Sequence, residues 1–347
     1  MLAEQQAGGF DAVYVAIGAQ VSRHVDIPAR DSAKVLAAVS LLRQVGGGEM
    51  PQLGRRVVIY GGGNTAMDAA RTARRLGAEE AVIIYRRDRA HMSAHEFEAE
   101  EAASEGIKIK RLTGIKDISG SDITVERMEL DANGRPQPTG EFETLKADAV
   151  ILALGQTTDT AFLRKVPGIA FGADGVVLVG KDMQTGHPGI FAGGDVTPAN
   201  RTVTNATGQG KHAARYIDAW LRGEAVARPE RHRLISFADL HVPIYDDVLA
   251  MRQKELPVGE REDFEEVVAG FDARQSRYEA KRCLSCGNCY ECDNCYAACP
   301  EDAIIKLGPG GGHKVDMHLC TGCAVCFDRC PCHAIDMVPE TAMEATQ

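Results

Sequence analysis

The sequence has no cysteine before Cys283, and all eleven cysteines lie between Cys283 and Cys332. It has no run of eighteen apolar residues, so it contains no candidate transmembrane helix. No stretch is rich in Lys and Arg, and the formal net charge is -10, which argues against a nucleic-acid-binding protein. The start shows no basic segment followed by an apolar core, as an export signal would. We therefore expect a cytoplasmic location and reduced cysteines.

Hydrophobic residues make up 44% of the 347 residues, which is enough for two or three domains with a substantial core. The chain contains 36 glycines, and they gather in short loops after strand-like runs. In α/β proteins, such loops bind phosphate groups. The composition therefore favours an α/β fold that binds nucleotides.

The cysteines show one spacing pattern twice. Two residues separate successive cysteines in the first three positions of each set, and the fourth cysteine stands immediately before a proline. This is the spacing of bacterial ferredoxins, in which three thiolates of one loop hold one 4Fe-4S cluster and the fourth cysteine ligates the other cluster. We therefore predict two 4Fe-4S clusters. Their ligands are Cys289, Cys292, Cys295 and Cys330 for the first cluster, and Cys320, Cys323, Cys326 and Cys299 for the second.

Two other uses of these cysteines fit less well. A disulfide scaffold is typical of small secreted domains, whereas this sequence shows no export signal and has no cysteine before Cys283. Zinc sites share the paired spacing, but the doubled four-cysteine pattern with its prolines favours iron and sulfur. Cys283 and Cys286 extend the spacing backwards, and Cys332 follows the last set. These three are either extra or alternative ligands, or buried free thiols beside the clusters.

A dinucleotide-binding fingerprint lies in the first half of the chain. A strand-like run over residues 56–60 is followed by a glycine turn, a helix-like run over 67–76 and a second strand-like run over 81–85. In this pattern one glycine makes the turn, the next lets a pyrophosphate approach the backbone, and a small third residue lets helix and strand pack. The predicted nucleotide contacts are Gly61, Gly62, Gly63, Asn64, Thr65 and Ala66.

The end of the second strand-like run indicates which nucleotide binds. An NAD site usually has an acidic residue here for the ribose 2'-hydroxyl, whereas this sequence has Arg86 and Arg87. Guanidinium groups suit a 2'-phosphate, so we predict NADPH. The alternative is that the two arginines form a solvated surface, with Asp88 paired to one of them.

Two similar runs flank this region. Residues 10–17 end at Gly18 and residues 147–154 end at Gly155, and each run suits a buried parallel strand. Their repetition predicts that the chain leaves one domain, builds a second domain and returns to the first. Ahead of the fingerprint, the spacing of apolar residues over 33–45 predicts a helix.

A further short strand-like run ends in Gly194 and Asp195, and a turn and a helix follow over residues 201–216. A carboxylate at a strand end can hold a ribityl or ribose hydroxyl, and the free N–H groups of a helix start suit the electron-rich edge of a flavin. This region is therefore a candidate flavin site. The alternative is that Asp195 only caps the turn.

Taken in order, these motifs resemble the small subunit of bacterial glutamate synthase and its wider family of FAD- and NADPH-dependent oxidoreductases. They are DAVYVAIGAQ from residue 11, VVIYGGGNTAMDAARTARRLGA from 57, IYRRDRAHM from 84, VILALGQ from 150, GIFAGGDV from 189 and TVTNATGQGKHAA from 202. The cysteine-rich end, from EAKRCLSCG at residue 279, resembles the longer members of that family, which carry a two-cluster ferredoxin domain. It is also similar to the ferredoxin-like subunit of 2-oxoacid:acceptor oxidoreductases.

The resemblance implies two dinucleotide-binding domains, with the NADPH domain inserted into the FAD domain. It implies that Arg86 and Arg87 hold the 2'-phosphate. The FAD-site residues that it implies are Gly155, Gly194, Asp195, Thr202 and Val203. Among these, Asp195 would bind the ribityl chain, and Thr202 and Val203 would contact the flavin ring through their backbone.

The expected domain limits follow from the motifs. They are a partial FAD-binding domain of residues 1–28 and 147–224, an inserted NADPH-binding domain of 52–146, a connector of 225–280 and a ferredoxin domain of 281–347. The family's first segment, with the glycine-rich turn for the FAD pyrophosphate, is absent from this sequence. We expect either a fragment of a longer protein or a second polypeptide that supplies this half.

Together these features predict two nested Rossmann-like α/β domains, the first incomplete, and a small α+β ferredoxin domain. The predicted function is an NAD(P)H-dependent oxidoreductase subunit that passes electrons between NADPH, FAD and two 4Fe-4S clusters, to or from a larger catalytic subunit or a ferredoxin-type partner. A thioredoxin-reductase-type enzyme needs a redox cysteine pair near the flavin, and no cysteine precedes Cys283. The remaining alternative is a non-catalytic electron-wiring iron-sulfur subunit with a vestigial nucleotide-binding domain.

Overall fold

The computed structural model describes residues 8–23, 27–30, 34–226, 235–241 and 247–339. The chain divides into two units. The first comprises Met1–Ala227 and Leu256–Glu266, and the second comprises Arg228–Glu255 and Val267–Gln347. The chain therefore passes between the units more than once. In the described ranges, no helix is long and apolar enough to span a membrane.

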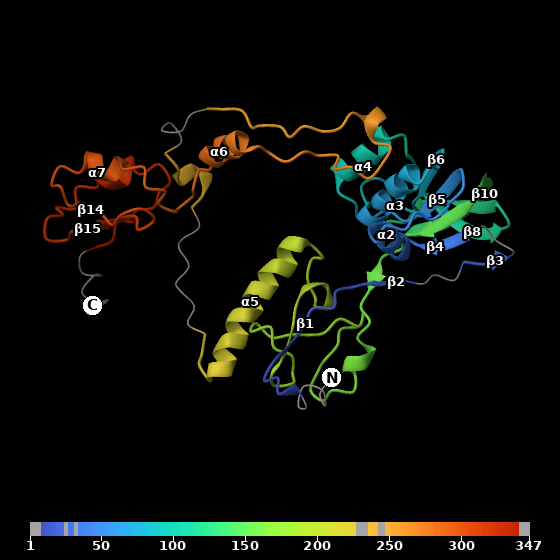
Figure 1. Ribbon diagram of the computed structural model, residues 1–347, viewed down its shortest axis with the longest axis horizontal. Helices are drawn as coiled ribbons and strands as arrows, with labels where there is room; N and C mark the ends of the chain where they lie inside the picture. The colour runs from blue at the N-terminus through green and yellow to red at the C-terminus, as the bar shows by residue number, and fades with distance from the viewer. Residues whose placement is uncertain (1–7, 24–26, 31–33, 227–234, 242–246, 340–347) are drawn as a thin grey trace. The chain divides into compact units, whose positions relative to one another are not determined.

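Residues 29–30 and 34–154 of the first unit contain the predicted dinucleotide turn, and we call them the nucleotide-binding part. A five-stranded parallel sheet forms their centre (Figure 1). In order across the sheet, its strands are β4 (Lys34–Ala37), β11 (Ala149–Leu152), β5 (Arg56–Tyr60), β6 (Glu80–Ile84) and β7 (Lys108–Lys110). The central strands are rich in Val and Ile, which suits a sheet that is covered on both faces.

Three helices cover one face of this sheet. They are α2 (Ala38–Gly46), α3 (Asn64–Arg75) and α4 (Glu96–Ser104). The buried face of α3 consists largely of alanines: Ala66, Ala69, Ala70 and Ala73. Because alanine has a short side chain, α3 can lie close to β5 and β6. Met67 and Ile83 fill the remaining space between the helix and the sheet.

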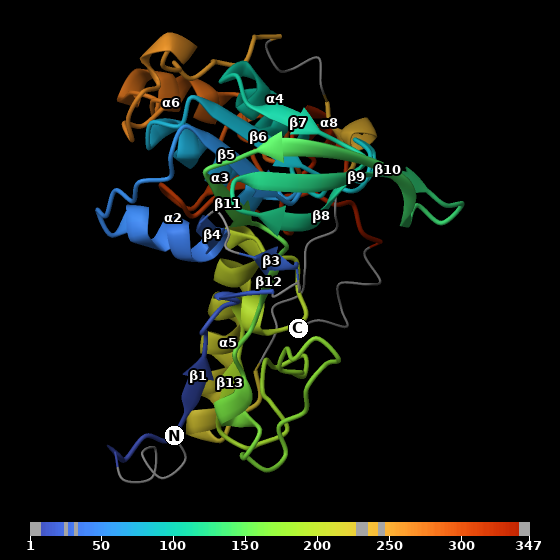
Figure 2. The ribbon, with the colours of Figure 1, turned by 90° about the vertical axis from the view of Figure 1, so that its right-hand side faces the viewer.

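A four-stranded sheet covers the opposite face (Figure 2). Its strands, in order, are β10 (Pro136–Lys146), β9 (Asp122–Leu130), β8 (Thr113–Ser119) and β3 (Ala29–Arg30). Its buried side chains Ile118, Ile123 and Val125 pack against Val58 and Ile84 of the parallel sheet. The nucleotide-binding part therefore has three layers: helices, parallel sheet and second sheet.

Two of the expected domain limits do not match this sheet. The sequence predicts one helix over residues 33–45, but Lys34–Ala37 forms strand β4 and the helix begins only at Ala38. Strand β11, expected to return to the first domain, lies between β4 and β5 and pairs with both. Main-chain hydrogen bonds therefore place both segments in the nucleotide-binding part, and its expected limits at 52 and 146 are wrong.

The remainder of the first unit contains smaller elements. Strands β1 (Val13–Val15) and β13 (Ile190–Ala192) pair in parallel, and β2 (Val21–Ser22) pairs with β12 (Gln156–Thr157) antiparallel. The helix α5 (Val203–Arg222) lies beside β13 (Figure 2), and Ala213 is the residue that it buries. Short 3-10 helices occur at Ala161–Leu163 (η1), Gly194–Val196 (η2), Phe237–Asp239 (η3) and Val258–Glu260 (η5).

The second unit shows an internal repeat around its cysteines. Its elements are α6 (Ala273–Lys281), α7 (Asn294–Ala298), β14 (Ile304–Lys306), β15 (His313–Val315) and α8 (Val325–Arg329). The short helices α7 and α8 each follow a residue in the left-handed region, Asp293 and Ala324, both with φ of 64°. Strands β14 and β15 pair antiparallel between the two halves of the repeat.

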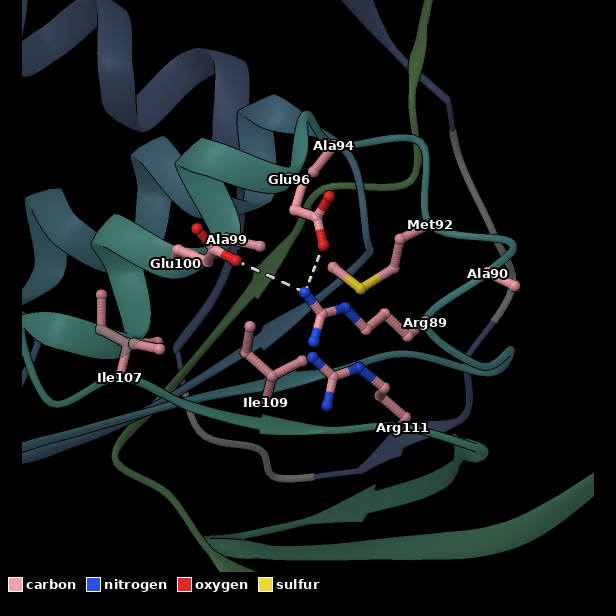
Figure 3. A pocket seen from close by; sticks show the side chains of 11 residues that line it. Arg89, Ala90, Met92, Ala94, Glu96, Ala99, Glu100, Ile107, Ile109 and Arg111 are labelled. Carbon is pink, nitrogen blue, oxygen red and sulfur yellow. Dashed lines mark hydrogen bonds and ion pairs between the residues drawn. The ribbon is translucent and has the colours of Figure 1, made fainter.

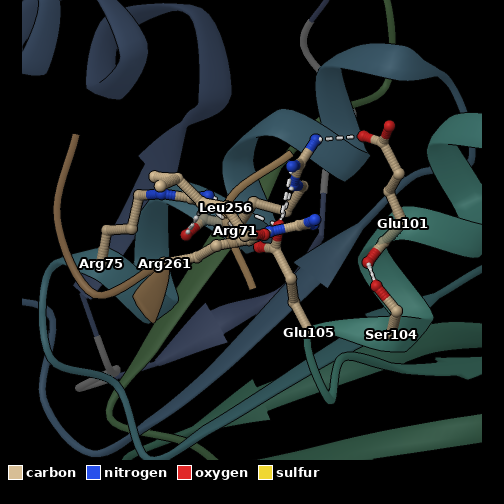
Figure 4. Close-up of polar contacts among 7 residues, drawn as sticks. All are labelled: Arg71, Arg75, Glu101, Ser104, Glu105, Leu256 and Arg261. Carbon is tan, nitrogen blue, oxygen red and sulfur yellow. Dashed lines mark hydrogen bonds and ion pairs between the residues drawn. The ribbon is translucent and has the colours of Figure 1, made fainter. Parts of the chain in front are cut away.

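The segment Leu256–Glu266, which we call the strap, packs on the nucleotide-binding part (Figure 4). The Nη1 atom of Arg261 is 3.2 Å from Oε1 of Glu105, just beyond the end of α4. Glu105 also pairs with Arg71 at 2.7 Å and with Arg75 at 3.2 Å, both on α3. A buried ionic cluster therefore holds the strap against two helices.

Candidate functional site

The predicted strand, glycine turn and helix are present at the start of α3. Gly61 has a φ of 156°, and a Cβ atom there would lie 2.2 Å from the carbonyl oxygen of Ala153, so only glycine fits. A Cβ atom on Gly62 would overlap the Tyr85 ring, at 2.3 Å. Gly63 has open space by comparison, with Oγ of Ser93 at 3.3 Å. Gly61 and Gly62 are thus needed for the fold, whereas the space beside Gly63 is more open.

The start of α3 carries the free N–H groups that suit a pyrophosphate. Asn64 and Thr65 are half-buried there, and Ala66 is completely buried against the sheet. The side chain of Asn64 accepts a hydrogen bond from the N–H of His95 at 3.0 Å. The N–H of Ala94 donates to the carbonyl of Gly62 at 3.1 Å. The loop before α4 therefore fixes the glycine turn, which the sequence pattern did not indicate.

The two candidate 2'-phosphate arginines stand at the end of β6. The guanidinium of Arg87 lies 5.7 Å from the centre of the Tyr85 ring, which itself packs on Gly62. Arg86 is exposed. Burial raises the pKa of the Tyr60 hydroxyl, and the positive charge of Arg86 acts in the opposite direction. Arg87 is therefore stacked beside the glycine turn, while Arg86 lies nearer the end of β5.

Asp88 is paired with a neighbour other than these arginines. Its Oδ1 atom lies 2.7 Å from Nδ1 of His91 and 3.1 Å from the backbone nitrogen of His91. These hydrogen bonds hold the pKa of the Asp88 carboxyl below its usual value. The ion pair between Asp88 and an arginine, which the sequence left open, does not occur among the described residues. Asp88 is thus paired with His91, and it forms no ion pair with Arg86 or Arg87 in the described part of the chain.

A cavity of about 680 Å³ lies between α4, β7 and the loop that precedes α4 (Figure 3). Arg89 and Arg111 point into it over an apolar floor that includes Ile109. Arg89 pairs with Glu96 and Glu100, so its charge is balanced within the cavity wall. The glycine turn does not line this cavity, which is therefore separate from the dinucleotide fingerprint.

The candidate flavin residues come together around η2 and the start of α5. A Cβ atom on Gly193 would lie 2.1 Å from the Tyr14 hydroxyl, so Tyr14 is packed against this turn. The N–H of Gly194 donates to Oε1 of Gln209 at 2.6 Å, and Asp195 follows it, half-buried. Gln209, in the second turn of α5, thus ties the strand end to the helix. The sequence showed Gln209 only as part of a glycine-rich helix start.

The start of α5 supplies the other candidate flavin contacts. The Thr202 hydroxyl accepts a hydrogen bond from the N–H of Asn205 at 3.2 Å and so caps the helix. The side chain of Val203 is 84% exposed. Gly155 follows β11 with a φ of 98°, and the Gly155 carbonyl accepts a hydrogen bond from the N–H of Arg23. These residues lie in one unit, with backbone N–H groups free at the helix start.

The cysteines of the second unit line two separate cavities. One is lined by Cys289, Cys292, Cys295 and Cys330, together with Cys332, and the other by Cys299, Cys320, Cys323 and Cys326. The two predicted ligand sets therefore each line one cavity. Cys299, the last cysteine of the first spacing pattern, lines the second cavity, and Cys330, the last cysteine of the second pattern, lines the first. In each case a backbone N–H points at that fourth sulfur: Ala334 at Cys330, 3.2 Å, and Ala303 at Cys299, 3.3 Å.

The chemistry of these donors fits iron-sulfur clusters. Four thiols around one cavity, with N–H groups directed at sulfur, are the donor set of a 4Fe-4S cluster. In the part of the chain that the structure describes, no three His, Cys, Asp or Glu side chains converge closely enough to hold a single metal ion. Burial raises the pKa of the Cys295 and Cys326 thiols, and binding to a metal would favour their thiolate forms.

The three remaining cysteines differ in position. Cys283 and Cys286 are exposed and line neither cavity. Cys332 is 2% exposed and lines the first cavity, and burial together with the neighbouring Cys330 raises the pKa of its thiol to about 12. His313 also lines this cavity, with Nε2 3.0 Å from Asp293 and Nδ1 3.8 Å from Sγ of Cys289. Spacing alone gave no sign of His313.

Comparison with known proteins identifies the family. Residues 3–210, more than half of the chain, match the pyridine nucleotide-disulphide oxidoreductase family. The chain belongs to this family. The pyridine nucleotide-disulphide oxidoreductase assignment agrees with the glycine turn and the parallel sheet, and it covers the region that resembles the glutamate synthase small subunit.

Similarity to individual proteins confirms the resemblance. The chain is 34% identical over 316 residues to the NADP(+)-dependent formate dehydrogenase subunit beta of Moorella thermoacetica, which covers 82% of this chain and 43% of the relative. It is 32% identical over 239 residues to the glutamate synthase [NADPH] small chain of Escherichia coli (strain K12), which covers 61% of this chain and 51% of the relative. The chain thus spans about half the length of these relatives.

A solved structure of the same fold confirms the predicted fold class. Mycobacterium tuberculosis FprA in complex with NADPH matches with a TM-score of 0.51 at 20% identity, over 65% of this chain and 68% of FprA. At this level of identity the match establishes the Rossmann-like α/β fold. Residues 3–210, which match the family, contain no cysteine.

Proposed function

We propose that this chain is an NADPH-dependent oxidoreductase subunit that passes electrons between NADPH, FAD and two 4Fe-4S clusters, to or from a partner. The observation that carries the proposal is the presence, in one chain, of a dinucleotide turn and two cavities, each lined by the four cysteines of one predicted ligand set. The names of the formate dehydrogenase and glutamate synthase relatives support NADPH as the nucleotide. The partner would be a larger catalytic subunit or a ferredoxin-type electron acceptor or donor.

The nucleotide side of the proposal rests on Arg87, Arg86 and the glycine turn. Gly63 lets the pyrophosphate reach the N–H groups at the start of α3. Arg87, stacked on Tyr85, holds the 2'-phosphate with paired charge-assisted hydrogen bonds, and Arg86 adds positive charge at the same strand end. Asp88 is engaged by His91 and does not compete for these arginines.

The flavin side rests on η2 and the start of α5. Asp195 would hold a ribityl hydroxyl, and the backbone of Thr202 and Val203 would face the flavin ring. Gln209 orients the turn that precedes Asp195 through the N–H of Gly194. We propose that a further polypeptide segment completes the FAD site, because α5 buries little of its surface and Val203 is largely exposed.

The bound groups and the protein would have different roles in electron transfer. When bound, the flavin and the clusters would supply hydride acceptance and single-electron transfer, which protein side chains do not provide. The chain's own residues position these groups: Thr202 caps α5 so that its N–H groups stay in place, and the N–H groups of Ala303 and Ala334 stabilise negative charge on Cys299 and Cys330. No general acid or base is required of the protein.

The domain limits follow the revised strand order. We propose a partial FAD-binding domain of residues 1–28 and about 155–224, a nucleotide-binding domain of 29–154, a connector of 225–280 and a ferredoxin domain of 281–347. The change from the sequence expectation is that β4 and β11 belong to the nucleotide-binding domain. A cytoplasmic location remains a prediction.

One experiment tests the proposal directly. Anaerobically purified protein should contain iron and acid-labile sulfide and should bind NADPH more tightly than NADH in a fluorescence titration. Protein without iron and sulfide, or with equal affinity for the two nucleotides, contradicts it. The second candidate, a non-catalytic electron-wiring subunit, is favoured by the exposed α5. It predicts both clusters but no reduction of added FAD by NADPH.

A further inference from the structure

The two cysteine cavities differ at one matching position. The chain reads Cys330-Pro331-Cys332 at the first cavity and Cys299-Pro300-Glu301 at the second. Cys332 lines the first cavity and Glu301 lines the second. The first cavity therefore contains one more thiol than the second.

The extra thiol lies next to the fourth ligand. Sγ of Cys332 is 3.8 Å from Sγ of Cys330, and both side chains are buried, with relative exposures of 2% and 8%. Sγ of Cys332 donates to the carbonyl of Asn288 at 3.1 Å. The carbonyl of Cys332 accepts a hydrogen bond from the N–H of Gly287 at 2.6 Å, which holds the backbone beside the cavity. One hydrogen bond of the side chain and one of the backbone thus hold Cys332 beside the first cavity.

We propose that Cys332 is a reserve ligand of the first cluster, which binds iron in place of Cys330 when the Cys330 bond is lost. The proposal rests on the proposed iron-sulfur function. The backbone of Cys332 is fixed by Gly287, so rotation of its side chain away from Asn288 is the change needed to present the sulfur to the position that Cys330 leaves. The second cluster has no such reserve, because Glu301 offers a carboxylate in place of the soft sulfur that these clusters select.

The ligand exchange balances without any redox partner. The bond between iron and the Cys330 sulfur would break and that sulfur would take up a proton from water. The Cys332 thiol would release its proton to water, and its sulfur would bind the same iron. The hydrogen bond from Cys332 to Asn288 breaks in this step. No electron is transferred, and a coordinated metal ion deprotonates a thiol directly.

The other spare cysteines do not fit this role. Cys283 and Cys286 are exposed and line neither cavity. Cys283 has Oγ of Ser285 as a neighbour at 4.0 Å. The reserve function is therefore specific to Cys332.

The test compares two alanine substitutions at matching positions in the full chain. Wild-type protein should contain about eight iron atoms, because each of two clusters has four. We expect Cys330→Ala to keep the full iron and sulfide content and Cys299→Ala to lose iron from the second cluster. Cys332→Ala alone should keep both clusters, and Cys330→Ala with Cys332→Ala should lose iron from the first. Iron and sulfide analysis and electron paramagnetic resonance report all four results.

A gain-of-ligand variant keeps the proposal testable if Cys330→Ala fails to fold. Glu301→Cys, added to Cys299→Ala, should restore the iron that Cys299→Ala loses, because it places a thiol at the position matching Cys332. A failure to restore it overturns the proposal, as does an iron loss in Cys330→Ala equal to that in Cys299→Ala. An iron loss in Cys332→Ala alone also overturns it, because Cys332 would then be an ordinary ligand. Wild-type protein without iron and sulfide refutes the proposed function instead.

Discussion

Arg261 and Glu105 are 156 residues apart in the sequence, yet their side chains form an ion pair of 3.2 Å in which each is only 6% exposed. The carboxylate of Glu105 is shared with Arg71 and Arg75, so three guanidiniums surround it. Glu101 pairs with Arg71 at 2.8 Å. This arrangement joins the strap to the nucleotide-binding part through one shared carboxylate.

The sharing of one carboxylate by three guanidiniums predicts unequal effects of removing Arg261 and of removing Glu105. Arg261→Ala should lower the free energy of unfolding by about 1.5–3 kcal/mol, the contribution of hydrogen bonds to a charged group. The loss is limited because Glu105 still pairs with Arg71 and Arg75. Glu105→Ala should lower the free energy of unfolding by about 3–5 kcal/mol, because it leaves buried guanidiniums without their shared partner. Urea unfolding at neutral pH measures both.

The matched control is the exposed pair Arg55–Glu79, whose side chains are 76% and 60% exposed. Arg55→Ala should change the unfolding midpoint little, because exposed pairs contribute little to stability. Equal losses for Arg261→Ala and Arg55→Ala would show that the strap is not held by the ionic cluster.

The same cluster predicts a dependence of stability on pH. Burial raises the pKa of Glu105, but hydrogen bonds and charges from Arg71, Arg75 and Arg261 outweigh it, so the folded pKa lies below the usual 4.5. A carboxyl with a depressed folded pKa contributes stability above its unfolded pKa and loses it as the pH falls through the folded pKa. The stability difference between wild type and Glu105→Gln should therefore be constant near neutral pH and shrink below 4.5. A difference that grows on acidification contradicts this.

The stacking of Arg87 on Tyr85 predicts nucleotide specificity. Arg87→Ala should weaken NADPH binding about 10- to 100-fold, because hydrogen bonds to a charged group contribute about 1.5–3 kcal/mol. Arg86→Ala should have a smaller effect in the same direction. NADH binding should not change in either variant.

Arg127→Ala is the control for that prediction, because Arg127 pairs with Glu141 on the second sheet and is 67% exposed. Fluorescence titration with both nucleotides gives the four affinities needed. An equal loss of NADPH and NADH affinity in Arg87→Ala would contradict a 2'-phosphate contact.

Two glycines of the same turn should respond differently to alanine. A Cβ atom on Gly61 would lie 2.2 Å from the Ala153 carbonyl oxygen, so Gly61→Ala should destabilise the fold by several kcal/mol, about 3 or more. A Cβ atom on Gly63 meets Oγ of Ser93 at 3.3 Å, so Gly63→Ala should change stability by about 1 kcal/mol or less.

Gly63→Ala should nonetheless lose affinity for NADPH, because its methyl group would stand where the pyrophosphate approaches the backbone. Thermal unfolding combined with nucleotide titration separates the two effects. Full NADPH affinity in a stable Gly63→Ala variant would show that the nucleotide does not reach this part of the turn.

Sequence reasoning succeeded where the determinants are local. The glycine turn and the cysteine sets each depend on spacings of a few residues, and the structure places them as those spacings predict. Strand β4 was missed because residues 34–37 have helical spacing, and their pairing with β11, more than a hundred residues later, determines their conformation. The Arg261–Glu105 pair has no local signal at all, because nothing near either residue indicates the other.

The course of the chain between its two units has a practical consequence for dissecting the protein. A recombinant fragment that stops near Ala227 would include every strand of the parallel sheet but would omit Arg261. Such a fragment would uncover a carboxylate and two arginines that the intact chain shields from water. Fragments meant to retain native properties should therefore extend at least to Glu266, even though this carries along part of the other unit.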